Sequence, residues 1–256
     1  MSTDPKNIVI KFLKENGYPF EMKVAREFQK KGFGIAQSVC FDDPNLNVIR
    51  EIDVLALWQE TFHEKKFTVL FIVECKYAKT PWILFSSLSD KFDKYYSSSS
   101  SGWRWINHLH KQNDFKHFFE LTHQVGYGLT TTMLDGDKQK DNAYKAVQTI
   151  LSFLKSEILK PRFSGDEYAL IIPIIAIRGK LFESHLNKND EIEAQEIHEA
   201  QLFYNEGGLG IIPKIHVVTE DVLSDYIQRL LEDTKRLFVH PFLDISIINP
   251  PVSSFF

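Results

Sequence analysis

Two short apolar runs joined by a polar stretch constrain this chain more than any other feature of its sequence. The runs are Glu51–Trp58 and Phe67–Lys76, and both are rich in β-branched and aromatic residues. Runs of this length and composition predict β-strands rather than helices. Residues 59–66 between them are mostly polar and predict a hairpin turn. A turn centred between His63 and Glu64 pairs residues whose numbers add up to 127.

This register places Asp53 directly opposite Glu74. Because side chains alternate along a strand, Glu74 and Lys76 share one face of the hairpin, while Cys75 points to the other face. Two carboxylates and an ammonium group are therefore expected to meet on an otherwise apolar hairpin. Burying these charges is costly unless the carboxylates hold a metal ion or pair with the lysine.

Composition narrows the classes of protein that fit this sequence. The chain has 256 residues, of which 43% are hydrophobic and 25% are charged, as in ordinary soluble globular proteins. This length is sufficient for one sizeable hydrophobic core. The net charge of −4 argues against a histone-like nucleic-acid binder, but it is compatible with a local basic groove.

Cysteine usage and the lack of targeting signals predict a cytoplasmic protein without membrane association. Cys40 and Cys75 form neither a disulfide framework nor a metal-ligand spacing, which favours a reducing compartment. The first ten residues lack the basic start and long apolar stretch of a signal peptide. The longest apolar run, 169–177, is too short to span a bilayer.

A helix upstream of the hairpin adds a third acidic candidate. This helix is predicted from Phe20 to about Lys31 and ends at Gly32. Glu21 precedes the apolar residues Val24, Ala25 and Phe28 by three, four and seven positions. The spacing predicts that Glu21 lies on the inward stripe of the helix rather than on its solvated face.

The remaining segments predict a single α/β domain over residues 1–256. The other predicted elements are a helix after Asp4–Pro5, a strand at 33–41, a helix at 141–158, strands at 168–177 and 211–218, and a final helix capped by Thr219. Residues 77–140 are predicted to form an irregular insertion. The acidic segment 190–205 is expected to be a surface helix or loop, with Glu191, Glu193, Glu196 and Glu199 on a solvated helical face.

The ordered set Glu21, Asp53, Glu74 and Lys76 resembles the PD-(D/E)xK nuclease superfamily, which has the restriction-endonuclease-like fold. The resemblance covers 18–76 and continues more weakly through 142–155 and 168–177. Ile52 replaces the proline of the family motif, but the aspartate that carries the chemistry is retained. The resemblance implies a mixed central sheet flanked by helices in αβββαβ order, with an insertion after the Glu-x-Lys strand.

The resemblance also implies a metal-dependent nuclease that hydrolyses phosphodiester bonds, with DNA as the expected substrate and a restriction, defence or repair role. Asp53, Glu74 and the backbone carbonyl of Cys75 would hold Mg²⁺, for which Mn²⁺ can substitute, and Glu21 would contact the ion directly or through water. Carboxylate oxygens are the hard ligands that Mg²⁺ prefers. Lys76 would orient the attacking water and stabilise the negative charge of the transition state.

Further residues are candidates for contacts with substrate. Gln148, on the predicted helix 141–158, is a candidate accessory residue of the site, with a solvated polar face as the alternative. Arg104, Lys111 and Lys116 lie among aromatic residues and are candidates for nucleic-acid contact. An ordinary mixed surface would explain the same pattern.

Other functions and roles stay open at this point. Asp53 and Glu74 are alternatively structural groups paired at the edge of the sheet. The chain is alternatively a catalytically silent nuclease-like module that binds nucleic acid or a partner protein, or a hydrolase acting on RNA ends or nucleotides. The sequence does not choose between DNA and RNA, between cleavage specificities, or between a monomer, a homodimer and a complex with an activating subunit.

Overall fold

The computed structural model describes residues 4–15, 18–62, 65–86, 125–132, 142–156, 168–204 and 214–239. The helices in these ranges are α1 (Pro5–Glu15), α2 (Tyr18–Lys30), α5 (Asn142–Lys155) and α6 (Leu223–Val239). The strands are β1 (Gly34–Asp42), β2 (Ile49–Phe62), β3 (Lys65–Tyr77), β4 (Trp82–Ser86), β5 (Val125–Thr131), β6 (Tyr168–Arg178), β7 (Leu181–Leu186), β8 (Ile192–Ile197), β9 (Glu199–Phe203) and β10 (Lys214–Thr219).

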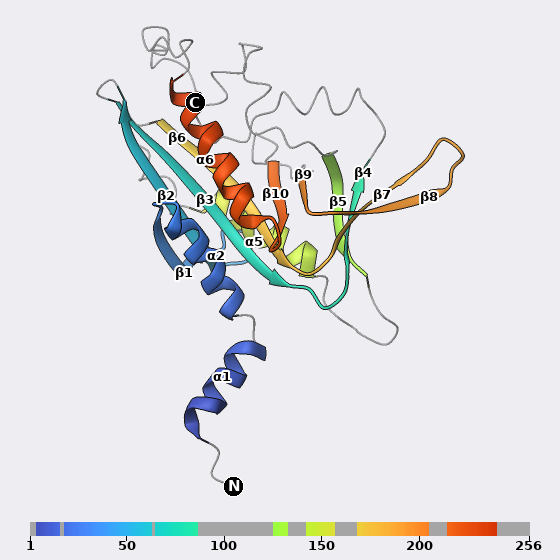
Figure 1. The fold of residues 1–256 in the computed structure, drawn as a ribbon, viewed down its shortest axis with the longest axis horizontal. Helices are drawn as coiled ribbons and strands as arrows, with labels where there is room; N and C mark the ends of the chain where they lie inside the picture. The colour runs from blue at the N-terminus through green and yellow to red at the C-terminus, as the bar shows by residue number, and fades with distance from the viewer. Residues whose placement is uncertain are drawn as a thin grey trace.

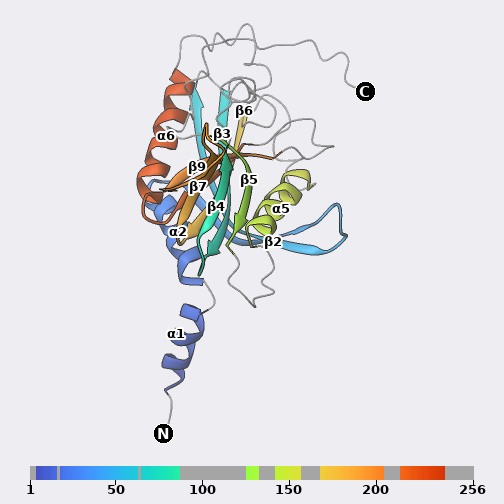
Figure 2. The same cartoon turned by 90° about the vertical axis from the view of Figure 1, so that its right-hand side faces the viewer.

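The described strands form one mixed sheet in the order β1-β2-β3-β6-β10-β9-β5-β4-β7-β8 (Figure 1). β1, β2 and β3 form an antiparallel meander, and β3, β6 and β10 are parallel neighbours at the centre. Helices α2 and α6 cover one face of the sheet, and α5 covers the other (Figure 2). The predicted α/β class, with a mixed sheet flanked by helices, is confirmed, and the sheet is larger than expected.

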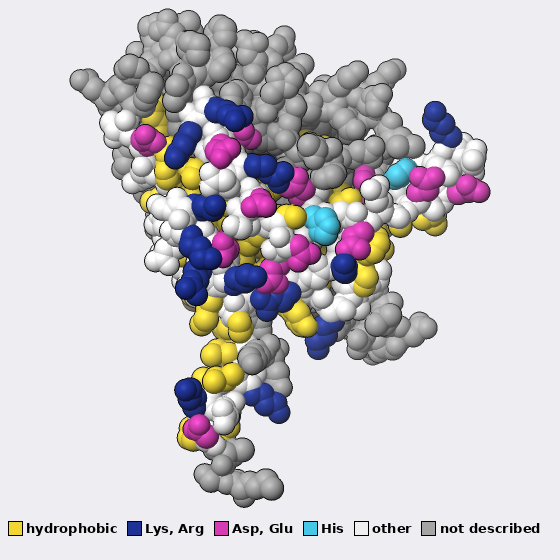
Figure 3. Space-filling model, in the orientation of Figure 1, with side chains coloured by type: hydrophobic (Ala, Val, Ile, Leu, Met, Phe, Trp, Pro, Cys, Tyr) yellow, Lys and Arg dark blue, Asp and Glu magenta, His cyan; other side chains and the backbone are white. Residues whose placement is uncertain are grey.

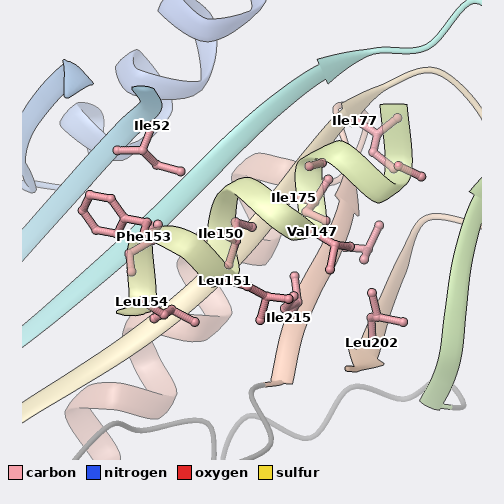
Figure 4. Packing of buried hydrophobic residues seen from close by; sticks show 14 of the residues in the cluster. Ile52, Val147, Ile150, Leu151, Phe153, Leu154, Ile175, Ile177, Leu202 and Ile215 are labelled. Atoms are coloured by element: carbon pink, nitrogen blue, oxygen red, sulfur yellow. The ribbon is translucent and has the colours of Figure 1, made fainter. Parts of the chain in front are cut away.

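The sheet is buried on both faces because its central strands are apolar throughout. In β3, Phe71 packs in the layer beneath α2 and α6, whereas its neighbour Ile72 packs in the layer beneath α5. Figure 4 shows the second layer, where Ile150 of α5 lies over Ile175 of β6. Strands buried on both faces read as continuous apolar runs, which explains why 67–73 and 169–177 show no polar alternation.

The predicted hairpin register is confirmed. β2 and β3 pair from Val54–Val73 to Phe62–Lys65, and the residue numbers of every pair add up to 127. The strands extend further into the polar stretch than expected, because the antiparallel ladder continues to residues 62 and 65. The prediction that residues 59–66 form the turn is therefore wrong at both ends of that stretch.

Both N-terminal helices begin or end close to the predicted residues. The backbone N–H of Lys6 donates to Oδ1 of Asp4 at 3.1 Å, which caps the first turn of α1. Helix α2 ends at Lys30, and Gly32 follows with φ = 87°, a conformation that favours glycine. Helix α1 projects from the body (Figure 1) and exposes Ile8 and Phe12. No described helix, α1 included, is long and apolar enough to cross a membrane.

Several sequence predictions are wrong because sheet pairing decides the conformation of weakly patterned segments. Residues 77–140 were predicted to be irregular but contribute β4 and β5 to the sheet. The acidic segment 190–205 forms β8 and β9 instead of a helix or loop, and β7, which the sequence pattern did not indicate, pairs with β8. Thr219 ends β10 rather than capping a helix, because α6 begins only at Leu223.

Candidate functional site

The candidate site lies where β2 and β3 part. Their ladder ends at Val54–Val73, beyond which β2 stays paired with β1 and β3 stays paired with β6. Asp53 and Glu74 are the first residues past this end. The expected pair Asp53–Glu74 fits the confirmed register but is the first pair that the ladder does not include.

A local irregularity in β1 and β2 orients Asp53. Ile52 and Val54 are two residues apart, yet they pack on opposite faces of the sheet. The ladder between β1 and β2 skips the pair Ser38–Asp53 at this point, and Ser38 has a left-handed φ of 53°. Oδ2 of Asp53 accepts a hydrogen bond of 2.6 Å from the backbone N–H of Cys75. A side chain thus replaces the backbone acceptor that a continued ladder would supply.

Glu74, which is buried, and Lys76, which is half-buried, form an ion pair on β3. The ammonium group of Lys76 donates to Oε1 of Glu74. Both residues point to the α5 side, since their register partners Ile175 and Ile177 on β6 belong to that apolar layer. Cys75 packs in the opposite layer, as predicted. The second carboxylate oxygen of Glu74, Oε2, is buried and has no hydrogen-bond partner among the described residues.

Asp53, Glu74 and Lys76 shift one another's pKa. Burial raises the pKa of Glu74 to about 8, and the charge of Asp53 adds to this shift against the opposing effect of Lys76. Burial also raises the pKa of Asp53, although Lys76 and the Cys75 N–H partly offset it. Burial lowers the pKa of Lys76, but the two carboxylates outweigh it and the net pKa is raised. With both carboxyl groups ionised, the site would hold more negative charge than one ammonium group neutralises, so it favours uptake of a proton or of a cation.

Glu21 belongs to the same electrostatic cluster. It lies in the first turn of α2 and is half-buried. Burial raises its pKa, the charge of Asp53 raises it further, and the charge of Lys76 lowers it, so Glu21 interacts electrostatically with both residues. Because α2 covers the face opposite to α5, Glu21 approaches the site from the other side of the parted strands. We call Glu21, Asp53, Glu74 and Lys76 together the carboxylate–lysine site.

A surface network fixes the end of α2 that carries Glu21. Glu220, which follows β10, accepts from Nε and Nη2 of Arg178 at 2.6 and 2.8 Å and from Nζ of Lys23 at 2.7 Å. The Arg178 guanidinium also lies 5.0 Å from the ring centre of Phe20, the residue before Glu21. Arg178 is the register partner of Tyr77 at the end of β3. The network therefore ties α2 to the C-terminal ends of β3 and β6, close to Glu74 and Lys76 in the sequence of β3.

Replacing Glu220 by glutamine should lower the free energy of unfolding by about 1 kcal/mol, because both of its cationic partners are partly exposed to water. Replacing Lys30, whose partner Glu27 lies on the same helix, should cost less than about 0.5 kcal/mol. Urea denaturation of both variants measures the difference. Equal losses would show that the Glu220 network does not anchor α2.

The other predicted site residues are Gln148, the backbone carbonyl of Cys75 and three basic residues of the segment 77–140. Gln148 is half-buried on α5, the helix that covers the face of Glu74 and Lys76. No hydrogen bond or ion pair within the described ranges joins Gln148 to the carboxylate–lysine site. The Cys75 carbonyl stays a candidate ligand. The proposed nucleic-acid contacts Arg104, Lys111 and Lys116 lie outside the described residues.

Sequence reasoning missed Ser38, Glu51 and the Arg178–Glu220 pair. Glu51 is an exposed neighbour whose charge raises the pKa of both Glu21 and Asp53. A usable signal existed for Arg178, because a polar residue at the C-terminal end of a buried parallel strand lies where ligands bind in open α/β sheets. Nothing in the local sequence marks Ser38, because serine rarely adopts a left-handed φ.

Among the described residues, no group of three or more His, Cys, Asp or Glu side chains is arranged to hold a metal ion. Comparison with protein-family models, with curated proteins and with solved structures gave no match. The case for a function therefore rests on the residues and geometry of the carboxylate–lysine site.

Proposed function

We propose that this protein is a cytoplasmic, metal-dependent nuclease with a restriction-endonuclease-like core, and that it hydrolyses phosphodiester bonds in DNA. The observation that carries this proposal is the buried Oε2 of Glu74, which lacks a hydrogen-bond partner among the described residues and neighbours a second, half-buried carboxyl group, Asp53. Ionising Glu74 there without a further cation is costly, which is why its pKa is raised and why a bound metal ion would be favourable. Perturbed carboxylates of this kind cluster at functional sites.

The residues at this site fit Mg²⁺ better than a structural metal. Mg²⁺ is usually bound through one or two carboxylates and keeps several water molecules or substrate phosphates as its other ligands. Asp53 and Glu74 supply two such carboxylates, so a third side-chain ligand is not required. The bound ion would polarise a phosphoryl oxygen and lower the pKa of the attacking water.

In this mechanism the carboxylates bind the metal ion and the lysine acts on the attacking water and the transition state. Asp53 is held in place by the Cys75 N–H, and Glu74 is held through Oε1 by Lys76. Lys76 remains cationic, since its pKa is raised. Its ammonium group orients the attacking water and stabilises the extra negative charge of the transition state. Glu21 adds a carboxylate on the opposite side, where it accepts a hydrogen bond from water.

Replacing Asp53 by asparagine or Glu74 by glutamine should weaken Mn²⁺ binding by more than about tenfold and abolish cleavage. Mutating residues that only orient the metal ligands commonly lowers metal affinity about 10- to 100-fold. Removing a ligand itself should lower the affinity at least as much. Titration calorimetry with Mn²⁺ at neutral pH, together with a DNA-cleavage assay, tests both effects.

Glu60→Gln is the matched control for this experiment. Glu60 is exposed on β2, and its register partner Phe67 lies at the far end of the hairpin from the site. This control should bind Mn²⁺ as the parent does. Parental affinity in both Asp53→Asn and Glu74→Gln would contradict the metal assignment.

One observation favours a second candidate, the catalytically silent module that binds nucleic acid or a partner protein. Within the described ranges, the site lacks a group of three acidic, histidine or cysteine side chains arranged for a metal. A silent module would retain the Glu74–Lys76 pair only for structural reasons. Nucleic-acid binding that persists unchanged without metal, in a parent that cleaves nothing, would favour this candidate.

A further inference from the structure

An open groove of about 450 Å³ lies between α2 and the edge strand β1. Met22, Ala25, Arg26 and Gln29 form its helical wall, and Ile35 and Gln37 form its wall on β1. The floor is thus partly apolar, while an arginine and two amide side chains supply hydrogen-bond donors. From Met22 to Gln29 the helix advances by about 10 Å, at 1.5 Å per residue.

The chain direction shows where this groove leads. The turn at Gly32 reverses the chain, so β1 runs back alongside α2 toward its N-terminal end (Figure 1). Gln37 is followed by Ser38, whose skipped partner on β2 is Asp53. Met22 follows Glu21 directly. One end of the groove therefore opens beside Glu21 and Asp53 of the carboxylate–lysine site.

The helical wall of the groove is positively charged. Lys23, Arg26 and Lys30 are exposed at positions i, i+3 and i+7 of α2, and Figure 3 shows Lys and Arg side chains gathered over this helix. Lys23 is paired with Glu220, and Lys30 is paired with Glu27. Arg26 makes no ion pair within the described part of the chain. Its guanidinium is therefore available to an anion in the groove.

We propose that this groove holds the sugar–phosphate backbone of the DNA strand that the carboxylate–lysine site cuts, with Arg26 contacting a phosphate. The proposal rests on the nuclease function proposed above, and it assigns the substrate grip to α2 and β1. An arginine fork matches a phosphate in charge and geometry. Gln29 and Gln37 donate to further phosphate or sugar oxygens, and the apolar floor contacts deoxyribose.

A peptide strand added to the open edge of β1 is a different occupant of the same place. Such a strand would bind mainly through backbone hydrogen bonds, so its binding would not depend on an unpaired arginine. The position of Arg26, and the opening of the groove beside Asp53, a proposed Mg²⁺ ligand, favour a phosphate-bearing chain. The two occupants differ in their response to salt, because only phosphate contacts release counterions.

The test is the binding of a labelled duplex oligonucleotide, measured by fluorescence anisotropy with a chelator at several salt concentrations. Arg26→Gln should weaken binding by about tenfold, and the slope of log affinity against log salt should become shallower by about one. Arg26→Glu should weaken it further. Lys188→Gln removes an exposed cation between β7 and β8 at the far end of the sheet and should match the parent.

The outcomes separate this inference from the nuclease proposal. If Arg26→Gln keeps the parent's affinity and salt slope, or if Lys188→Gln loses as much, the groove assignment is overturned, whether or not the parent cuts DNA. If the parent binds no DNA, the groove assignment also falls. If the parent cuts no DNA with Mn²⁺, but Arg26→Gln loses DNA affinity and Lys188→Gln does not, the groove assignment is supported and the nuclease proposal is contradicted.

Discussion

Replacing Lys76 by alanine should lower the rate of DNA cleavage by roughly a hundredfold or more while leaving metal and DNA binding close to the parental values. One well-placed electrostatic group in an active site is commonly worth that factor. Lys76 supplies no metal ligand, and its ammonium group matters most when the attacking water and the phosphate carry extra negative charge. Cleavage of labelled duplex DNA with Mg²⁺ or Mn²⁺, against a chelator control, measures the loss.

Two opposing effects keep metal affinity near its parental value in this variant. Without Lys76, Glu74 holds its proton more tightly, which disfavours binding of a cation. The same substitution removes a positive charge that repels the cation. Lys76→Arg should also cleave poorly, because a broad guanidinium cannot replace a compact ammonium group in a buried position.

Equal cleavage by Lys76→Ala and the parent would contradict the proposed site and make Glu74 and Lys76 structural. A parent that cuts plasmid, linear duplex, single-stranded DNA and RNA under no condition would instead favour the silent module. Both results are informative, because binding of metal and of DNA is measured separately from cleavage in the same preparations.

The free energy of unfolding of the metal-free protein should fall by a few kcal/mol as the pH rises from about 5 to about 9. The cause is Glu74, whose pKa in the folded protein is raised from 4.5 to about 8. Between these values the folded state binds more protons than the unfolded state, so raising the pH favours unfolding. The stabilising contribution is complete below pH 4.5 and is lost as the pH passes through 8.

Asp53 and Glu21 should act in the same direction, since their pKa values are also raised. The raised pKa of Lys76 lies above this pH window and does not contribute. Urea denaturation with a chelator measures the trend, and Glu74→Gln should show a clearly flatter one. Added Mn²⁺ should restore stability at high pH, because it binds the folded state alone. Parallel trends for parent and variant would contradict the assigned pKa.

The hairpin could be predicted from sequence because several local signals agreed. Two apolar runs, a polar connection and a symmetric turn fixed the register of β2 and β3, and the alternation along β3 placed Cys75 opposite to Glu74 and Lys76. The inward position of Glu21 followed from helical spacing in the same way. These features depend on neighbours within about 25 residues, which a single sequence displays directly.

The parting of β2 and β3 could not be predicted, because it depends on a third strand. Alternation along a regular strand would place Ile52 and Val54 on the same face of the sheet. They lie on opposite faces, and Ser38 of β1, beside this point, has a left-handed φ. Strands β7, β8 and β9 were missed for a related reason. In the segment around Glu193, acidic spacing resembled a helix, and only pairing with β7 makes it a strand.

The parallel pairing of β3 with β6 has a consequence for synthesis of the chain. Each pair in this ladder joins residues about 100 positions apart, such as Phe67 with Tyr168. At a ribosome adding about 5–20 residues per second, β3 emerges roughly 5–20 s before its partner. During that interval an apolar strand with an open edge has no native neighbour on one side. We therefore expect nascent chains that end before residue 168 to be the form of this protein most prone to aggregation and most dependent on chaperones.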